Sequence, residues 1–325
     1  MNPTSDQKSA RRRAPLLVRL LARLPGPWWA WTVAAVSLYP IMIAAGSTMC
    51  GPRAPGLGSV VFYATSCAFA GWATLWAWRR IEALRPLVAR LTGDSAEDPF
   101  RGADSTWWAL ALAFLTPVPY LAPFALNCPR TTALELYAAA VVAALPLMSV
   151  FWMFVIVARG LLRLGARPLR LEPFERDRAL GLRPLGSLAF GLYMVYAAVT
   201  TSLALVTSYE RLQLLSTLAF SVIGLGMFFL QMRGLRRQML AGKAAHTEWA
   251  RELYAAVVES VRRDPSPEGL DRQAHRVLAA AEIKREVAGI QEWPVDDSLL
   301  RTVVAIGTSI TAAILARLIL TRVGL

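Results

Sequence analysis

Long uncharged apolar runs alternate along this chain with shorter segments that are rich in arginine. A helix needs about 20 apolar residues to cross the hydrocarbon core of a bilayer, and several runs reach that length. They occupy residues 28–46, 59–78, 107–126, 134–158, 187–208, 214–231 and 299–320. The pattern predicts an all-α, polytopic integral membrane protein with seven transmembrane helices, arranged as three helical hairpins and a final helix.

Composition and charge fit a protein that is oriented in a membrane. Hydrophobic residues make up 55% of the 325-residue chain and charged residues only 18%, too apolar for a soluble domain of this size. The net charge of +13 comes from arginines at the ends of the apolar runs, whereas the intervening short loops hold one each, Arg53, Arg130 and Arg211. By the positive-inside rule the N-terminus is cytoplasmic and the C-terminus external. Because no aromatic-interleaved basic module accompanies the charge, we expect no nucleic-acid binding.

The pattern divides the chain into four parts. Residues 1–27 form a basic cytoplasmic tail, in which 14–24 is predicted to be an interfacial amphipathic helix whose arginines meet anionic headgroups. A disordered basic tail is the alternative. Residues 28–231 hold six transmembrane helices, 232–297 a cytoplasmic helical hairpin, and 298–325 the seventh transmembrane helix with the external C-terminus.

The first and third apolar runs open alike. Each begins with a Trp pair, has a proline twelve residues later (Pro40 and Pro119), and is followed by a cysteine that leads into Pro-Arg (Cys50 and Cys128). Parallel hairpin repeats would explain this, and so would the general recurrence of tryptophans at membrane interfaces. Both cysteines fall in loops predicted to face the oxidising side, so they either form a disulfide or are two unpaired residues at helix ends. Cys67 lies inside an apolar run.

The interiors of the runs contain small polar residues in place of charges. No Asp, Glu, Lys or Arg lies near the middle of any run, which argues against ion-coupled transport. The small polar residues of the fifth and seventh runs are Thr200, Thr201, Ser202, Gly307, Thr308, Ser309 and Thr311. Such residues either let helices pack closely or line a wet path. Under the second interpretation, the group at 307–311 lines a pore.

The segment between the sixth and seventh runs is the main non-membrane element. Residues 234–263 are predicted to continue the sixth helix into the cytoplasm, 264–267 to break it, and 268–290 to form a second helix. Apolar residues recur at helical spacing in both halves, which favours an antiparallel hairpin. A hairpin of this size buries little core alone, so we expect it to dock on another cytoplasmic surface or on another subunit. Trp293 is expected at the membrane interface.

No pattern for catalysis or metal binding occurs. The chain lacks GxGxxG, P-loop, GxSxG and HExxH motifs. The two histidines, His246 and His275, lie too far apart along the predicted hairpin to share a metal ion. Glu172, Glu175 and Asp177 alternate with arginines, as in a solvated ion-pair loop. We therefore expect no enzyme activity, no cofactor and no metal.

The topology resembles that of the insect chemoreceptor ion-channel superfamily and its remote relatives. Shared features are seven spans, a long cytoplasmic loop after the fourth, a sixth helix that runs into the cytoplasm, and a cytoplasmic helix that leads into the seventh. The resemblance implies a tetramer held by its cytoplasmic helices, with the seventh helix lining a pore. The family motif in that helix is Thr-Tyr, five apolar residues, then Gln-Phe. With Thr308 on the Thr of the motif, this chain has Ser309, Leu315 and Ala316 at the other three positions.

Two further segments, "FERDRALGLRPLG" and "EWPVDD", look like features of uncharacterised bacterial multi-pass membrane proteins. This second resemblance implies a location in a bacterial inner membrane. The preference for arginine over lysine along the chain is typical of a genome rich in G and C.

Three functions follow from these patterns. The first is a homo-oligomeric, channel-like or sensor protein whose seventh helix lines the pore. The second is a small-molecule carrier, without membrane-embedded carboxylates, whose site lies between the hairpins near Pro40 and Pro119. The third is a membrane scaffold or signalling protein that acts through its cytoplasmic hairpin.

Overall fold

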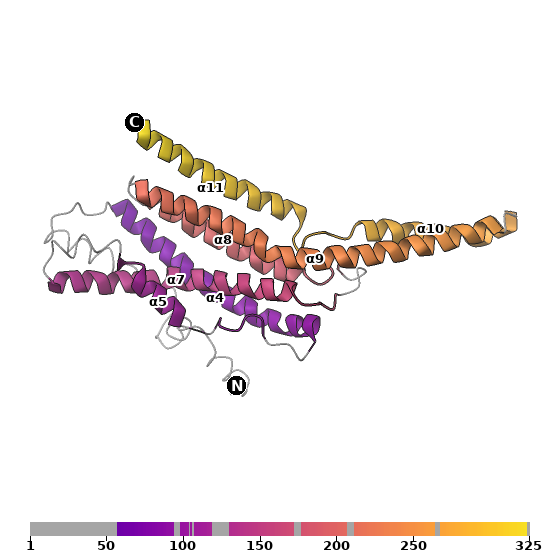
Figure 1. Cartoon of the computed structure of the whole chain (residues 1–325), viewed down its shortest axis with the longest axis horizontal. Helices are drawn as coiled ribbons and strands as arrows, with labels where there is room; N and C mark the ends of the chain where they lie inside the picture. The colour runs from indigo at the N-terminus through magenta and orange to yellow at the C-terminus, as the bar shows by residue number, and fades with distance from the viewer. Residues whose placement is uncertain are drawn as a thin grey trace.

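The computed structural model describes residues 57–93, 98–103, 105, 107–118, 130–171, 177–206, 211–263 and 267–323. Across these ranges all regular secondary structure is helical and no strand occurs. The helices are α4 (Leu57–Thr92), α5 (Trp107–Leu115), α7 (Arg130–Gly165), α8 (Arg183–Val206), α9 (Arg211–Arg263), α10 (Pro267–Ala288) and α11 (Asp297–Val323). Figure 1 shows a helical bundle from which α9 and α10 project together. The predicted all-α class is confirmed for this part of the chain.

Four helices are long and apolar enough to cross a membrane. The qualifying stretches are Ala133–Gly165 in α7, Arg183–Ser202 in α8, Thr217–Arg263 in α9 and Asp297–Ile319 in α11. They coincide with the last four predicted spans. Of the other three, 28–46 lies outside the described residues, 59–78 lies within α4, and 107–126 is described only as far as residue 118. The structure is thus compatible with a multi-pass membrane protein on the basis of four apolar helices.

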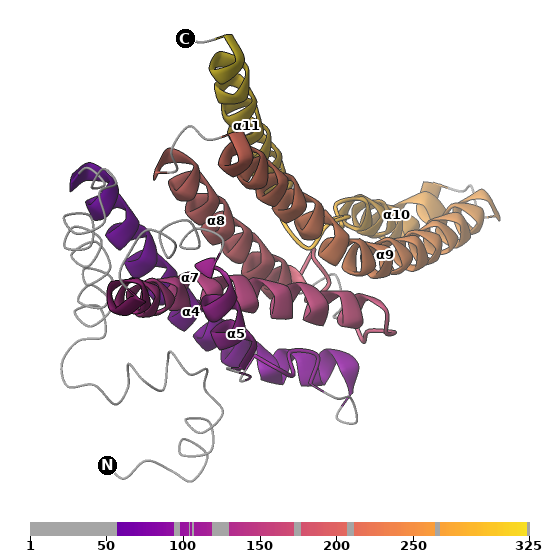
Figure 2. The same cartoon turned by 60° about the vertical axis from the view of Figure 1, so that its left-hand side comes forward.

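Helix α7 lies inside the bundle and α11 lies at its edge. Among the described elements, α7 packs mainly against α4, α5, α8 and α9, whereas the main contacts of α11 are with α8 and α9. The two views in Figures 1 and 2 agree that α11 lies on the outside of the bundle. Helix α9 links the two regions, because it packs on α7, α8, α11 and α10.

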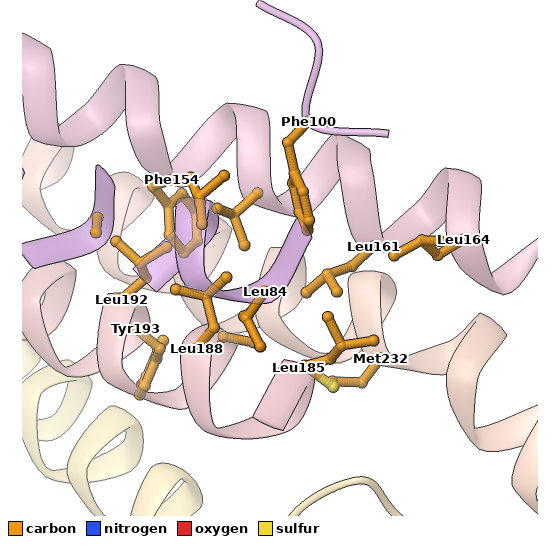
Figure 3. Packing of buried hydrophobic residues seen from close by; sticks show 14 of the residues in the cluster. Leu84, Phe100, Phe154, Leu161, Leu164, Leu185, Leu188, Leu192, Tyr193 and Met232 are labelled. Atoms are coloured by element: carbon orange, nitrogen blue, oxygen red, sulfur yellow. The ribbon is translucent and has the colours of Figure 1, made fainter. Parts of the chain in front are cut away.

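The core lies between α4, α7, α8 and α9 and is filled by large aliphatic and aromatic side chains (Figure 3). Leu161, Leu185 and Leu192 are almost completely buried there. Phe100, from the loop that follows α4, inserts against Gly160 of α7, where a Cβ would come within 2.5 Å of the phenyl ring. In a membrane, moving a leucine side chain from lipid into protein gains little free energy, because both surroundings are apolar. Such a core is therefore stabilised mainly by close van der Waals packing.

Helices α7 and α9 cross in backbone contact. A Cβ added at Gly165 would lie 2.5 Å from the Cα of Gly234, and one added at Gly234 would lie 2.7 Å from the Cα of Gly165. Only glycine at both positions permits this approach, since a side chain on either helix would push the axes apart. The crossing fixes where α9 leaves the bundle.

The arginine-rich ends of several helices meet at one end of the bundle. The Arg170 amide, just after α7, donates to the Leu91 carbonyl oxygen at the end of α4 (2.8 Å). Arg183, at the start of α8, pairs with Asp296, just before α11 (3.0 Å). The segments predicted to be cytoplasmic therefore lie together, as the charge pattern requires.

A single helix joins the bundle to the projecting hairpin. Helix α9 has 53 residues and α10 returns along it, so the predicted continuation and the predicted second helix are both confirmed. The base of the hairpin is anchored, because Ala250, Val287 and Ile290 pack against Leu180 of the loop before α8. This part of the hairpin docks on the bundle of its own chain.

Candidate functional site

Helix α11 carries the residues predicted to line a pore. It begins at Asp297, and the amide of Leu300 donates to the Asp296 carbonyl oxygen (3.1 Å). An acidic residue in the first turn is favourable there because the N-terminal end of a helix dipole is positive. Only 17% of the apolar stretch of α11 is buried, against 67% for α7. Most of the helix surface is thus uncovered within one chain.

Gly307 and Thr311 hold α11 against its neighbours. Gly307 is buried, and a Cβ there would lie 2.8 Å from the Tyr193 hydroxyl oxygen and 3.0 Å from a methyl of Leu225. Thr311, one turn later, is half-buried and donates its hydroxyl hydrogen to the Gly307 carbonyl oxygen (2.8 Å). Small residues at such points let helices approach closely. Gly307 therefore packs α11 on α8 and α9, and Thr311 follows one turn later on the same side of the helix.

Thr308 and Ser309 lie on the uncovered side of α11. Both are exposed. The Thr308 hydroxyl donates to the carbonyl oxygen of Val304 (2.8 Å), one turn earlier, and also lies 3.1 Å from that of Ala305. A hydroxyl that donates in this way still has lone pairs free to accept. Thr308 thus presents a hydrogen-bond acceptor at the helix surface.

A groove separates α8 from α11 beside these residues. It has a volume of about 460 Å³ and no charged lining residue. Small residues form much of both walls: Ala197, Ala198, Thr201 and Ser202 on α8, and Ala305 and Ser309 on α11. Two of the small polar residues of the fifth predicted span therefore lie close to one of the seventh.

Residues 290–296, called the junction, connect the cytoplasmic hairpin to α11. The Trp293 ring lies under the Arg236 guanidinium group, with 4.6 Å from its Cζ to the ring centroid, and edge-on to Phe229 at 6.2 Å. The Pro294 carbonyl sits where a side chain on Gly186 would be. Trp293 thus joins α9 to the start of α11.

Polar contacts also hold the junction. The Gln291 amide donates to the Arg178 carbonyl oxygen (3.1 Å), and the Gln291 side chain donates to Asp296 (2.8 Å). Lys243 pairs with Glu292 at 3.2 Å. Displacement of the hairpin base would therefore pull directly on the first turn of α11.

The cysteines divide between described and undescribed residues. Cys50 and Cys128 both lie outside the described residues, so their disulfide stays a prediction. Cys67 is buried in α4, and its thiol lies 3.4 Å from the Ala143 carbonyl oxygen of α7. Its position inside an apolar run matches a packing role.

Asp177 has a structural task in the loop before α8. Its carboxylate accepts hydrogen bonds from the amides of Ala179 (3.0 Å) and Gly181 (3.1 Å). These bonds stabilise a tight turn in which Leu180 adopts a φ of 54° and Gly181 a φ of 82°. The other two acidic candidates, Glu172 and Glu175, lie outside the described residues.

The two histidines lie on different helices of the hairpin. His275 is exposed on α10 and His246 is half-buried on α9. Across the part of the chain that the structure describes, no three His, Cys, Asp or Glu side chains gather closely enough to hold a metal ion.

Two buried residues, Tyr196 and Gln231, were not identified by the sequence patterns. Tyr196 donates its hydroxyl to the Phe220 carbonyl oxygen (2.7 Å), and its ring fills the space beside Gly224. Gln231 is 1% exposed, and its side-chain amide has no hydrogen-bond partner among the described residues. Hydrophobic periodicity marks the faces of a helix but not the partner of each face, so these contacts carry no sequence signal.

Comparison with known proteins assigns no family. No protein-family model, no curated protein and no solved structure matches this chain.

Proposed function

We propose that this protein is a homo-oligomeric, channel-like or sensor protein of a bacterial inner membrane, with seven spans and α11 lining the pore. The observation that carries the proposal is the uncovered side of α11. Its exposed residues between 305 and 316 are mostly small or hydroxyl-bearing: Ala305, Thr308, Ser309, Ala312, Ala313 and Ala316. Small residues of this kind favour helix–helix contact in membranes, and the hydroxyl oxygens favour a wet surface.

The cytoplasmic hairpin is the proposed anchor of the oligomer. Its base docks on its own chain through Ala250, but the hairpin leaves Trp249 and Leu278 uncovered, the latter 67% exposed. The junction links this hairpin to α11 through Trp293. An anchor in the cytoplasm and a pore helix in the membrane are therefore joined by one short rigid connection.

The bilayer orientation in the proposal has the N-terminus inside and the C-terminus outside. The meeting of arginine-rich helix ends at one end of the bundle supports it, because the positive-inside rule places such ends in the cytoplasm. The absence of catalytic motifs from the sequence favours a function without chemistry on a substrate.

Ion flux tests the pore. The full chain is reconstituted in vesicles and flux is compared for wild type, Thr308→Ser and Thr308→Leu. We expect Thr308→Ser to conduct, because it keeps the hydroxyl oxygen, and Thr308→Leu to block flux while the oligomer stays intact, because an apolar ring at a narrow point favours dewetting. Vesicles that leak no faster than empty ones under every ionic gradient would refute the pore.

Particle mass tests the oligomer. The full chain in mild detergent should have the mass of an oligomer, a tetramer under the family resemblance. Deletion of residues 241–289 should leave an inserted monomer, because it removes the outer part of the hairpin and its exposed apolar side chains. A monomeric full-length protein contradicts the proposal.

A scaffold function is the second candidate, and one observation favours it. The segment 232–297 contains equal numbers of acidic and basic residues, and Trp249, Val258 and Leu278 are exposed along it. Exposed apolar side chains on a segment without net charge favour a protein partner over an anionic one. If the protein is monomeric and Leu278→Glu abolishes binding of a purified cytoplasmic partner, the scaffold function replaces the channel.

A further inference from the structure

Helix α4 carries a row of stacked aromatic side chains on one face. The Phe69 and Trp72 rings stack with 5.6 Å between their centroids, and the Trp72 and Trp76 rings with 6.5 Å. Spacings of three and four positions place the rings on one stripe of the helix. Phe69 is 36% exposed and Trp72 43% exposed. The aromatic ladder, defined as these three residues, is thus a continuous apolar surface that the described bundle leaves partly uncovered.

Two arginines follow the aromatic ladder along α4. Arg79 and Arg80 come three and four positions after the last ring, and both are exposed. In the part of the chain that the structure describes, no acidic side chain pairs with either of them, whereas Arg85 pairs with Glu82 (3.2 Å) and Asp98 (3.4 Å). The nearby carboxylates therefore neutralise Arg85, and the charges of Arg79 and Arg80 face the surroundings.

Helix α8 lies against the arginine end of the aromatic ladder. A Cβ on Gly191 would lie 2.3 Å from the Trp76 ring, so the two helices touch there. They run in opposite directions (Figure 2). Ser187, four residues before Gly191, and Arg80, four residues beyond Trp76, therefore both lie about one helical turn to the same side of this contact. Ser187 is exposed, and its hydroxyl is a second type of donor at the level of the arginines.

We propose that this surface binds one anionic phospholipid, with an acyl chain along the aromatic ladder and the phosphate group held by Arg79, Arg80 and Ser187. The inference rests on the proposed membrane position of α4 and is independent of the pore. Basic side chains between helices at the cytoplasmic face are typical of sites for anionic headgroups, and in the proposed orientation this end of α4 is cytoplasmic.

The length of the surface fits a lipid of one leaflet. Phe69 and Arg80 are 11 residues apart, which is about 17 Å along the helix. Half of the hydrocarbon core of a bilayer is about 15 Å thick. With the arginines at the level of the phosphate group, the aromatic ladder therefore extends over the depth of the acyl chain of the same leaflet.

The charges at the arginine end favour an anionic headgroup over a zwitterionic one. A zwitterionic headgroup such as phosphocholine brings an ammonium group next to its phosphate. That cation would lie near two arginines, while Glu82 and Asp98 are already paired with Arg85. Phosphatidylglycerol brings the phosphate without the cation, so we expect it to bind more tightly than phosphatidylcholine.

Lipid titration of the full chain tests the site. Delipidated protein in mild detergent is titrated with phosphatidylglycerol or with phosphatidylcholine of the same acyl chains, and bound lipids are counted by native mass spectrometry. Combined Arg79→Gln and Arg80→Gln should weaken phosphatidylglycerol binding about 30-fold, because one basic residue near an anionic lipid surface contributes about a five-fold factor. Phosphatidylcholine binding should change little. Since both side chains are exposed, the variant should unfold at the wild-type temperature.

Matched controls separate the site from general attraction. Arg233 and Arg237 are exposed on α9, so Arg233→Gln with Arg237→Gln removes the same charge away from the aromatic ladder and should leave the affinity for phosphatidylglycerol within about two-fold. Trp72→Ala should weaken both lipids, because it removes acyl-chain contacts and no charge. Trp249→Ala, which removes an exposed tryptophan from the hairpin, should weaken neither.

Each other outcome refutes a defined statement. Equal losses for the two arginine pairs would mean that net charge alone attracts the lipid, and equal affinities for the two lipids would exclude recognition of the headgroup. Displacement of the lipid by glycerol phosphate at the same concentration would show that the acyl chain and the aromatic ladder contribute nothing. A chain that passes these tests but conducts no ions keeps the lipid site and loses the proposed pore.

Discussion

Helices α7 and α11 are similar in composition and different in environment. Their apolar stretches have mean hydropathies of 2.5 and 1.9, yet 67% of the first and only 17% of the second is buried. Within the described ranges the main packing partners of α7 are α4, α5, α8 and α9, and those of α11 are α8 and α9. Apolar character thus marks a helix as suited to a membrane without saying whether protein or lipid surrounds it, because both surroundings are apolar.

The side chains on the two helices explain the difference. Helix α7 places Met153, Phe154 and Leu161 in the core, where they are at most 3% exposed. Helix α11 buries Val303, Gly307 and Ile314 along one narrow face. Helix α7 therefore lies at the structural centre of the described bundle, and most of the surface of α11 is not covered by it. Four experiments test this contrast.

The largest effect is expected at the contact between α7 and α9. Gly234→Leu forces a side chain into the Gly165 backbone, which cannot move aside as a flexible side chain can, so we expect a loss of about 3 kcal/mol or more in the free energy of unfolding. Thermal unfolding in detergent measures it. The matched control on the same helix is Gly226→Leu, because a Cβ at Gly226 has no heavy atom within 4 Å. This control should be neutral or slightly stabilising, since it removes a glycine from a helix, and equal losses for the two variants would contradict the packing described here.

A pair of leucine truncations compares α7 and α11 directly. Leu161→Ala should lower the free energy of unfolding by about 2–3 kcal/mol, because Leu161 is 0% exposed and its removal leaves a cavity. Leu315→Ala should lower it by less than about 0.5 kcal/mol, because this side chain is 44% exposed. Unfolding in detergent measures both changes, and a loss of stability in Leu315→Ala as large as that in Leu161→Ala would mean that α11 is an interior helix.

Loosening the junction should affect α11 and spare α7. Trp293→Ala removes the contacts with Arg236 and Phe229, and we expect a local loss of about 1–2 kcal/mol. Amide hydrogen exchange should speed up in the first turns of α11 with no change in α7. Trp249→Ala is the control, because Trp249 is 46% exposed, and it should leave exchange in α11 unchanged. Faster exchange in both helices would show that Trp293 supports the whole bundle.

The smallest effect is expected at the exposed ion pair between the starts of α8 and α11. Arg183→Gln removes the partner of Asp296, but the Arg183 side chain is 64% exposed. Such pairs contribute up to about 1 kcal/mol, and the contribution should disappear in high salt because ions screen it. If Arg183→Gln lowers the free energy of unfolding by the same amount in high salt, the Arg183 side chain stabilises the protein by something other than this exposed ion pair.

The sequence predicted the elements better than their contacts. The last four apolar runs, the continuation of the sixth into α9 and the end of α9 at Arg263 were all visible, because apolar run length and proline positions have direct physical meanings. The continuation of α4 through Pro86 as far as Thr92 was not, because tertiary contacts can override the effect of a proline on a helix.

The predicted site was only partly resolved by sequence. Helical periodicity places Gly307 and Thr311 on one side of α11 and turns Thr308 and Ser309 away from that side. It does not say which side is covered by other helices. That depends on Tyr193 and Leu225, which lie far away along the chain. Likewise, nothing in the runs around Gly165 and Gly234 indicates that these two glycines touch.

The length of α9 has a mechanical consequence. Its 53 residues form one helix of about 80 Å, with no break between its apolar half and its polar half. A rod without a joint cannot bend in its middle as a hinged arm would. A displacement of the outer half is therefore transmitted along the rod to the half that lies in the bundle, with no change in secondary structure.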